Sequence, residues 1–382
     1  MKFSPPMRSM RISCAWLFLA ALSLLAASAR AETPADDARF QAFDLAMARD
    51  YLLPRYQALV QATDQQQQSW VGFCRQPSAE GFATVRAAFQ AAMDAWMPLQ
   101  HVHVGPVSLQ TRIERIYFWP ERKNAVTRQV AALLQAGDAA ALAPDRMTMA
   151  SVAVQGFPAL QLLLYDGDNP AAPFLSGDPA AAYRCGYGTA VAGNLKSIAG
   201  QLVDGWTAAI GAMAAVPAKS GAEYGLLPSP RETAQQMFTD LLTLFQLVGD
   251  FKLGLPLDES LENPKPKLAE SWKSGRSLRN VELNLESAQA MYGMDRTSGF
   301  RFLLPAGADG DALDRQITDG FATALSAVAA IPMPLDAAVA DPVGRPKVEA
   351  LLTDIRRVRN LVGQQLPSLI GLSVGFNGLD GD

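Results

Sequence analysis

Apolar residues along most of the chain recur at steps of three and four, the spacing of one face of an α-helix. The longest such pattern follows Asp178, and its apolar members are Tyr183, Tyr187, Val191, Leu195, Ile198, Leu202, Trp206 and Ile210. Another, near the C-terminus, consists of Val348, Leu351, Leu352, Ile355, Val358, Leu361 and Val362. Each pattern predicts a long helix with one buried stripe.

Similar stripes occupy most of the remaining sequence, at about 36–62, 78–99, 122–135, 230–250, 276–292 and 311–329. The alternation of apolar and polar residues that is typical of half-buried strands is nearly absent. The sequence therefore predicts an all-α fold.

Two stretches interrupt the helical patterns. "MAAVPAKSGAEYGLLPSP" (213–230) has three prolines and many small residues, which is typical of a connector. With roughly four helices on each side, we expect two helical-bundle domains at 32–212 and 231–382, joined by a linker at 213–230. A second irregular stretch at 254–277 is long for a bundle connection, and such loops are often functional or disordered.

The N-terminal 31 residues have the organisation of a secretory signal. Lys2, Arg8 and Arg11 precede a short apolar stretch, and Ala29-Arg30-Ala31 fits the small-x-small cleavage rule. We predict cleavage after Ala31, export to the periplasm and no membrane insertion afterwards, because no second apolar stretch follows.

Charge argues against two classes of partner. The chain has 33 basic and 37 acidic residues, and four of the basic ones lie in the predicted signal, which leaves 29 against 37 and a net charge of −8. No Lys/Arg-rich block is present, so we expect binding to neither nucleic acid nor anionic membranes.

Signal cleavage would leave two cysteines, Cys74 and Cys185. In an oxidising compartment an isolated pair is more often a disulfide than a pair of metal ligands. We predict the disulfide, and the chain-entropy model gives it a stabilisation of about 4–5 kcal/mol.

The sequence offers few residues for catalysis. His101 and His103 are the only histidines, in "MPLQHVHVGPV". One can be packed and the other exposed, or they can contribute to a metal or ligand site. Metalloprotease, phosphate-loop and dinucleotide motifs are absent, and no Ser-His-Asp or Cys-His pairing can be argued.

The segment "GFPALQLLLYDGD" (156–168) has the features of a helix start. Proline is favoured in a first helical turn, so a helix is expected to begin near Phe157 or Pro158. Pro158 and Gln161 are three residues apart and share a face. A histidine and a glutamate at these positions would make a pair of metal ligands.

The chain resembles the imelysin family, also catalogued as the M75 peptidases. The resemblance rests on "LLPRYQALV" (52–60), "RIERIYFWPERK" (112–123), "SVAVQGFPALQLLLY" (151–165), "KPKLAESWKSGRSLRNVELNLE" (265–286) and "GLSVGFNGLDGD" (371–382). It implies two four-helix bundles with a site in the groove between them, export, and often a connection to iron acquisition.

The family signature is Gly-x-His-x-x-Glu, and this sequence departs from it. Gly156 matches, while Pro158 replaces the histidine and Gln161 replaces the glutamate. Zinc-assisted hydrolysis needs several protein ligands and an open position for water. The resemblance therefore implies a remodelled site without catalytic residues.

Other polar residues in the family-like segments are candidates for ligand binding. Arg115 and Trp119 can equally belong to a solvated helix face with a tryptophan anchor. Ser274, Ser277 and Asn280 are spaced by three, which suits either a ligand site or a cap followed by a helix–helix contact. Asn377 can line the site or dock the tail. With Gly156 and Gln161, these residues form the predicted ligand site; His101 and His103 are the candidate metal ligands.

Three functions follow. The first is an exported, non-catalytic binding protein linked to iron or metal acquisition, with iron or another divalent metal as possible cofactor and iron-uptake or other envelope proteins as partners. The second is a metal-independent scaffold that binds a peptide, glycan or partner protein. The third, a metallopeptidase with displaced ligands, is least supported because Pro158 and Gln161 cannot replace the signature residues.

Overall fold

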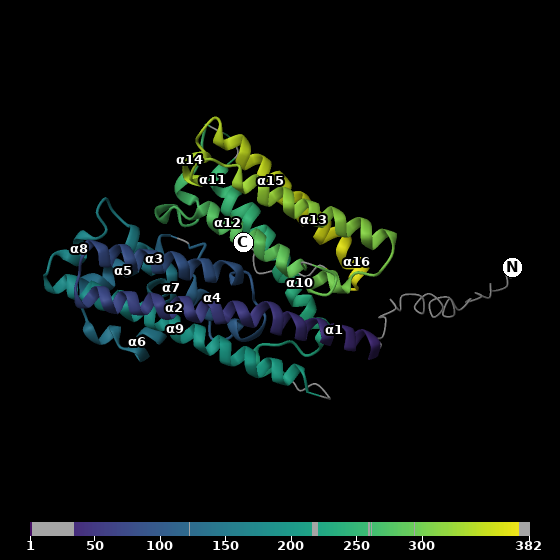
Figure 1. Cartoon of the computed structure of the whole chain (residues 1–382), viewed down its shortest axis with the longest axis horizontal. Coiled ribbons are helices and arrows are strands. Elements are labelled where there is room, and N and C mark those ends of the chain that lie inside the picture. The colour runs from purple at the N-terminus through teal and green to yellow at the C-terminus, as the bar shows by residue number, and fades with distance from the viewer. Residues whose placement is uncertain are drawn as a thin grey trace.

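The computed structural model describes Met1 and residues 34–121, 123–215, 221–258, 260, 262–293 and 295–373. Every regular element in these ranges is a helix, so the predicted all-α class is confirmed (Figure 1). The predicted signal segment and Asn377 lie outside the described residues. No helix among those described is long and apolar enough to cross a membrane.

The elements before the predicted linker are α1 (Pro34–Ala46), η1 (Met47–Leu52), α2 (Leu53–Arg75), α3 (Ala79–Trp96), η2 (Met97–Leu99), η3 (Gly105–Ser108), α4 (Arg112–Ile116), α5 (Ala125–Ala136), η4 (Ala139–Leu142), α6 (Pro144–Met149), η5 (Val152–Val154), α7 (Gly156–Tyr165), α8 (Ala172–Leu175) and α9 (Pro179–Met213). Those after residue 220 are η6 (Ala222–Tyr224), α10 (Pro230–Gln246), η7 (Leu247–Gly254), α11 (Leu255–Leu257), η8 (Pro266–Leu268), η9 (Trp272–Ser274), α12 (Ser277–Tyr292), η10 (Gly299–Leu303), α13 (Ala308–Ala329), α14 (Leu335–Ala338), α15 (Gly344–Asn360), η11 (Leu361–Gln365) and α16 (Leu366–Ile370). The elements η1, η7 and η11 are π-helical turns, and the other η elements are 3₁₀ helices.

Side-chain caps set the start of several long helices. Ser78 accepts a hydrogen bond from the backbone at the start of α3, and Asp178 does the same for α9. Ser229 forms a reciprocal capping box with Glu232 at the start of α10. Each cap satisfies backbone N–H groups that have no partner inside the helix, so these residues fix where the helices begin.

The π-helical turns join neighbouring α-helices without a break. Thus α1, η1 and α2 form one continuous helix, and α10, η7 and α11 form another. The extra residue of a π-turn shifts the buried face of the helix, and such turns are often found at functional sites. The turn η7 carries Lys252, whose charged side chain is buried.

In the first half, α2 packs against α3 and α9, and α7 packs against α3 and α9. Rings of Trp70, Phe73, Phe82 and Phe174 contact one another in the interior. The predicted disulfide is present, and Cys74 at the end of α2 is bonded to Cys185 on α9. The covalent link holds these two helices together at one end of the molecule.

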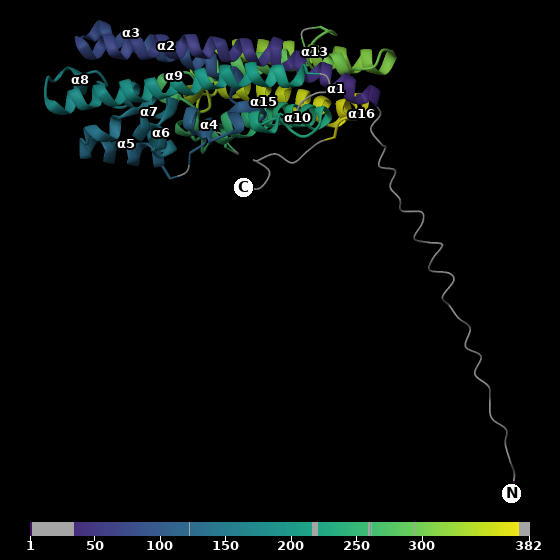
Figure 2. The same cartoon turned by 90° about the horizontal axis from the view of Figure 1, so that it is seen from below.

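In the second half, α13 packs against α12 and α15, and α10 packs against α12 and α15. Helix α1 is continuous with α2 of the first half, but it packs against α10 and η10 of the second half. Figure 1 shows α1 next to α10. Figure 2 shows the helices of both halves lying side by side in an elongated molecule. The exact domain bounds stay predictions.

The stripes expected from the sequence face the interior. On α9, the buried members are Tyr187, Val191, Leu195, Ile198, Leu202 and Trp206. On α15, they are Val348, Leu351, Leu352, Ile355 and Val358. The periodicity therefore identified both helices and the face that each buries.

Candidate functional site

Helix α7 begins at Gly156, at the position expected for the family signature. Gly156 has φ +72°, and a Cβ there would lie 2.3 Å from the carbonyl oxygen of Ile116. Only glycine combines this backbone conformation with so close an approach. Pro158 occupies the first turn, where its missing N–H is not needed, and Gln161 follows on the same face, half-buried.

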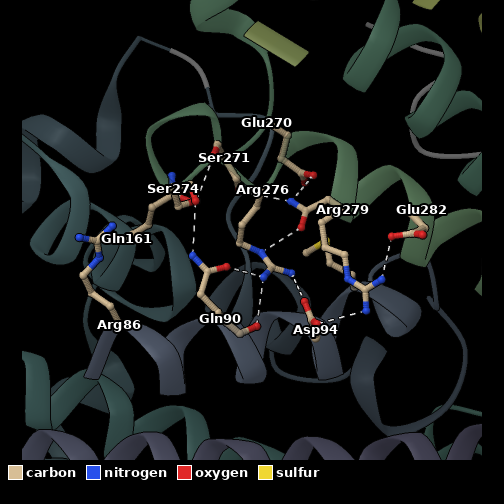
Figure 3. Close-up of polar contacts among 12 residues, drawn as sticks. Arg86, Gln90, Asp94, Gln161, Glu270, Ser271, Ser274, Arg276, Arg279 and Glu282 are labelled. Carbon is tan, nitrogen blue, oxygen red and sulfur yellow. Dashed lines mark hydrogen bonds and ion pairs between the residues drawn. The ribbon is translucent and has the colours of Figure 1, made fainter. Parts of the chain in front are cut away.

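The Gln161 side chain contacts the loop that precedes α12 (Figure 3). The Ser274 hydroxyl donates to Gln161 Oε1 at 3.0 Å and lies equally close to the carbonyl oxygen of Ser271. From α3, Gln90 Nε2 donates to the hydroxyl of Tyr165 on α7 at 2.7 Å. Two predicted site residues, Gln161 and Ser274, are thus brought together across 113 positions of sequence.

Glu270, in the same loop, is buried and accepts hydrogen bonds from several residues. It was not identified as a site residue from the sequence. Its Oε2 accepts hydrogen bonds from Asn280 Nδ2 and Lys252 Nζ, both at 2.7 Å, and the side chains of Lys252 and Glu270 are 1% and 0% exposed. The Ser277 hydroxyl donates to the Glu270 carbonyl oxygen at 2.6 Å. Ser277 and Asn280 therefore hold this loop against the start of α12.

Lys252 reaches Glu270 from the π-turn η7. Its Nζ also donates to Asn284 Oδ1 at 2.6 Å and to Gln100 Oε1 at 2.8 Å. Burial lowers the pKa of Lys252, and the neighbouring Glu270 carboxylate opposes that shift. A buried ion pair is tolerable only when its remaining donors and acceptors are satisfied, and here amide groups do so.

Arg276 links the loop to α3 in the first half. The guanidinium is buried, and its Nη1 donates to Gln90 Oε1 at 2.6 Å while Nη2 contacts Asp94. Its Nε donates to Asn280 Oδ1 at 3.2 Å. Arg279 adds an exposed contact with Asp94, as Figure 3 shows. We call Gln161, Glu270, Ser271, Ser274, Arg276, Ser277 and Asn280, with Gln90 and Asp94 of α3, the α7–α12 polar network.

Trp119 borders this network, whereas Arg115 lies in another cluster. The Trp119 ring centroid is 5.6 Å from Lys252 Nζ, a cation–π contact. Arg115 donates from Nε to Gln155 Oε1 at 3.2 Å and from Nη2 to Asn194 Oδ1 at 3.3 Å. It therefore serves a polar cluster inside the first half and makes no contact with Gln161.

The two histidines have different surroundings. His101 is completely buried, and neither ring nitrogen has a hydrogen-bond partner among the described residues. Its pKa is lowered to about 3 by burial and by the nearby charges of His103, Arg55 and Lys252. His103 is part-exposed, and its backbone N–H donates to Asp240 Oδ2 at 2.8 Å. Burial raises the pKa of Asp240 to about 6, although the His103 charge opposes that shift.

These residues do not fit a bound metal ion. No group of three or more His, Cys, Asp or Glu side chains in the described part of the chain is arranged to hold one. Proline has no side-chain donor, a neutral amide is a weak ligand, and Gln161 Oε1 already accepts from Ser274. The positive charges that disfavour an imidazolium at His101 would also disfavour a metal cation there. The role of His101 and His103 as metal ligands stays a prediction.

The sequence contained weak signals for the residues that were missed. Lys252 interrupts the apolar run "LVGDFKLGL", and Glu270 lies inside the segment 265–286 that resembles the family. A single charge in an apolar pattern can also mark a solvated position, so neither residue could be assigned without its partner. Gln90 and Asp94 lie on a helix whose polar face has no distinguishing spacing.

Comparison with known proteins connects this geometry to a family. The imelysin (peptidase M75) family model matches residues 52–362. The iron-regulated protein A of Synechococcus elongatus is 23% identical over 329 residues, which cover 84% of this chain and 83% of that protein.

Two crystal structures share the fold. An imelysin-like protein from Psychrobacter arcticum has a TM-score of 0.71 and 20% identity, with 89% of this chain and 98% of that chain covered. An iron-regulated protein A precursor from Parabacteroides distasonis has a TM-score of 0.62 and 17% identity, with 88% and 96% covered. Since the family model spans most of the sequence, this chain belongs to the imelysin family.

Proposed function

We propose that this protein is an exported, non-catalytic binding protein of iron acquisition, with its ligand site at the α7–α12 polar network. The link to iron is supported by the relatives, one of which is named iron-regulated protein A. Export is supported by the N-terminal signal pattern and by the name of the Parabacteroides distasonis relative, which is a precursor. We place the protein in the periplasm, with envelope proteins of iron uptake as its partners.

One observation carries the non-catalytic assignment. At the glutamate position of the family signature, Gln161 Oε1 accepts a hydrogen bond from Ser274, and the histidine position is Pro158. A hydrolytic zinc site needs charged or imidazole ligands and a metal-bound water. Amide and hydroxyl groups at these positions can instead hydrogen-bond a polar ligand.

The composition of the network favours a ligand other than a bare metal ion. It combines the amides of Gln90, Gln161 and Asn280 with the Ser274 hydroxyl and the Arg276 guanidinium. Its two carboxylates, Glu270 and Asp94, are already paired with Lys252 and Arg276. Such groups recognise peptide, glycan or carboxylate oxygens and nitrogens. The metal-independent scaffold is therefore the form of the binding function that the site supports best.

Growth under iron limitation tests the proposed role. A strain lacking the protein should grow more slowly than wild type in medium treated with an iron chelator, and the wild-type gene should restore growth. Gln161→Leu, which removes the Ser274 contact, should fail to restore it, while the exposed control Thr207→Ala should succeed. Normal growth of the deletion strain in chelated medium would refute the connection to iron.

Elemental analysis tests the non-catalytic part. Wild-type protein purified from its native compartment should contain no more zinc or iron than the Gln161→Leu variant does. It should also show no chelator-sensitive cleavage of a denatured protein. Bound metal lost in this variant, together with chelator-sensitive cleavage, would establish a peptidase instead.

A further inference from the structure

A cavity of about 610 Å³ lies between α9, the end of α2 and the segment of η4 and α6, away from the α7–α12 polar network. Its wall includes the Cys74–Cys185 disulfide and Leu142, and positions 186, 190 and 193 of α9 are glycine or alanine. Because these small residues fill little space, α9 presents a hollow where a larger side chain would close it. The volume falls within the range of ordinary small-molecule pockets.

The lining also contains polar residues, and none of them is charged. Thr148, Asn194 and Ser197 form a polar edge, Gln67 and Thr189 lie elsewhere in the lining, and no Asp, Glu, Lys or Arg belongs to it. The Thr148 hydroxyl lies 3.5 Å from Asn194 Oδ1. The cavity thus combines an apolar body with a short polar edge, the usual composition of a site for an amphiphilic small molecule.

Two buried cations lie directly behind this polar edge. Arg115 Nη2 donates to Asn194 Oδ1 at 3.3 Å. Arg112 Nη2 donates to Gln201 Oε1 at 3.2 Å, and Gln201 Nε2 donates to Ser197 Oγ at 3.3 Å. Each guanidinium is therefore one or two hydrogen bonds from a residue that lines the cavity.

Neither arginine has a carboxylate partner in the described part of the chain. Both are more than nine-tenths buried, and their hydrogen bonds end on amide and carbonyl oxygens. Arg112 Nε is buried without any partner among these residues. Burial lowers the pKa of both groups, and Arg115 lowers that of Arg112 further. Two adjacent desolvated cations without a counter-ion are costly, and an anion would relieve that cost.

We propose that this cavity binds an organic anion, a molecule with an apolar body and one carboxylate-like group, whose charge is stabilised by Arg115 and Arg112. The apolar body lies along the glycine and alanine positions of α9 beside the disulfide. The anionic group lies at the edge formed by Thr148, Asn194 and Ser197. Charge complementarity, rather than apolar area alone, determines which molecules bind.

Calorimetric titration of the mature protein with octanoate tests the proposal, with acetate and 1-octanol as companion probes. Octanoate should bind, whereas acetate lacks the apolar body and 1-octanol lacks the charge, so both should bind at least tenfold more weakly. Equal binding of octanoate and 1-octanol, or no binding of octanoate at millimolar concentration, would overturn the proposal.

Two variants locate the binding. Arg115→Gln removes one cation, and Ala190→Leu fills the cavity without touching either arginine, so each should weaken octanoate binding at least tenfold. Ala131→Leu, a matched change in a different surface pocket lined by Ala131, should leave it unchanged. If Arg115→Gln does not fold, Ala190→Leu alone decides the outcome. Wild-type affinity in Ala190→Leu would show that octanoate binds elsewhere and would refute the assignment.

Discussion

Replacing the buried His101 tests whether its lowered pKa contributes to the pH dependence of folding stability. The side chain is fully buried, and its pKa is lowered to about 3, first by burial and then by the charges of His103, Arg55 and Lys252. Replacing it by phenylalanine keeps a ring of comparable size and removes the titration. The pH dependence of stability should therefore change in a defined direction.

The magnitude follows from proton linkage. In the unfolded chain a histidine titrates near pH 6.5, so between about pH 6.5 and pH 3 the unfolded state binds the additional proton. Because the folded pKa is depressed, wild-type stability is lost as the pH falls through this range. The loss attributable to His101 is about 1.4 kcal/mol at pH 5.5 and about 2.7 kcal/mol at pH 4.5.

Urea unfolding at pH 7, 5.5 and 4.5, followed by circular dichroism, measures the effect. Relative to the difference between the two proteins at pH 7, the free energy of unfolding of His101→Phe should exceed that of wild type by about 1.3 kcal/mol more at pH 5.5 and about 2.6 kcal/mol more at pH 4.5. Gly200→Ala, a helical position with open space around its Cβ, should follow the wild-type pH profile.

A difference between wild type and His101→Phe that is the same at all three pH values would refute the reasoning. A zinc-dependent rise in the Tm of wild type that is absent in His101→Phe would instead support the metal-ligand role predicted for this histidine.

Three further predictions concern stability. Burial raises the pKa of Asp240 to about 6, so its proton is bound more tightly in the folded state. Wild type should therefore lose about 3 kcal/mol of folding free energy as the pH rises from about 3 to about 7. Asp240→Asn should lack this loss, and an unchanged slope in urea titrations would contradict it. Gly156→Ala should cost at least about 2 kcal/mol in urea unfolding, because its φ is positive and a Cβ would overlap backbone oxygen atoms; a cost as small as that of Gly200→Ala would count against this. Replacing Cys74 and Cys185 together by serine should lower the free energy of unfolding by about 4–5 kcal/mol in the loop model, as should reducing wild type; stability unaltered by either treatment would exclude a disulfide in solution.

The helices, and the absence of metal-ligand side chains at the start of α7, could be predicted from the amino-acid sequence alone. The stripes on α9 and α15 are buried as their spacing indicates, since a 3.6-residue period assigns one face of a helix to the interior. Pro158 and Gln161 exclude the signature ligands whatever the fold, because donor chemistry belongs to the residue. The disulfide was also predicted from the sequence, since the predicted signal cleavage would leave two cysteines.

Which helix faces contact one another could not be predicted from the sequence, because it depends on how the helices pack. Gln161 and Ser274 are far apart in sequence, and their contact depends on how the loop before α12 docks on α7. Lys252 and Glu270 can each be taken for solvated residues, and only their mutual pairing makes the burial of both tolerable. Periodicity is a local property of one helix, whereas the partner of a buried charge is set by the packing of several, so the polar network could not be derived from the pattern alone.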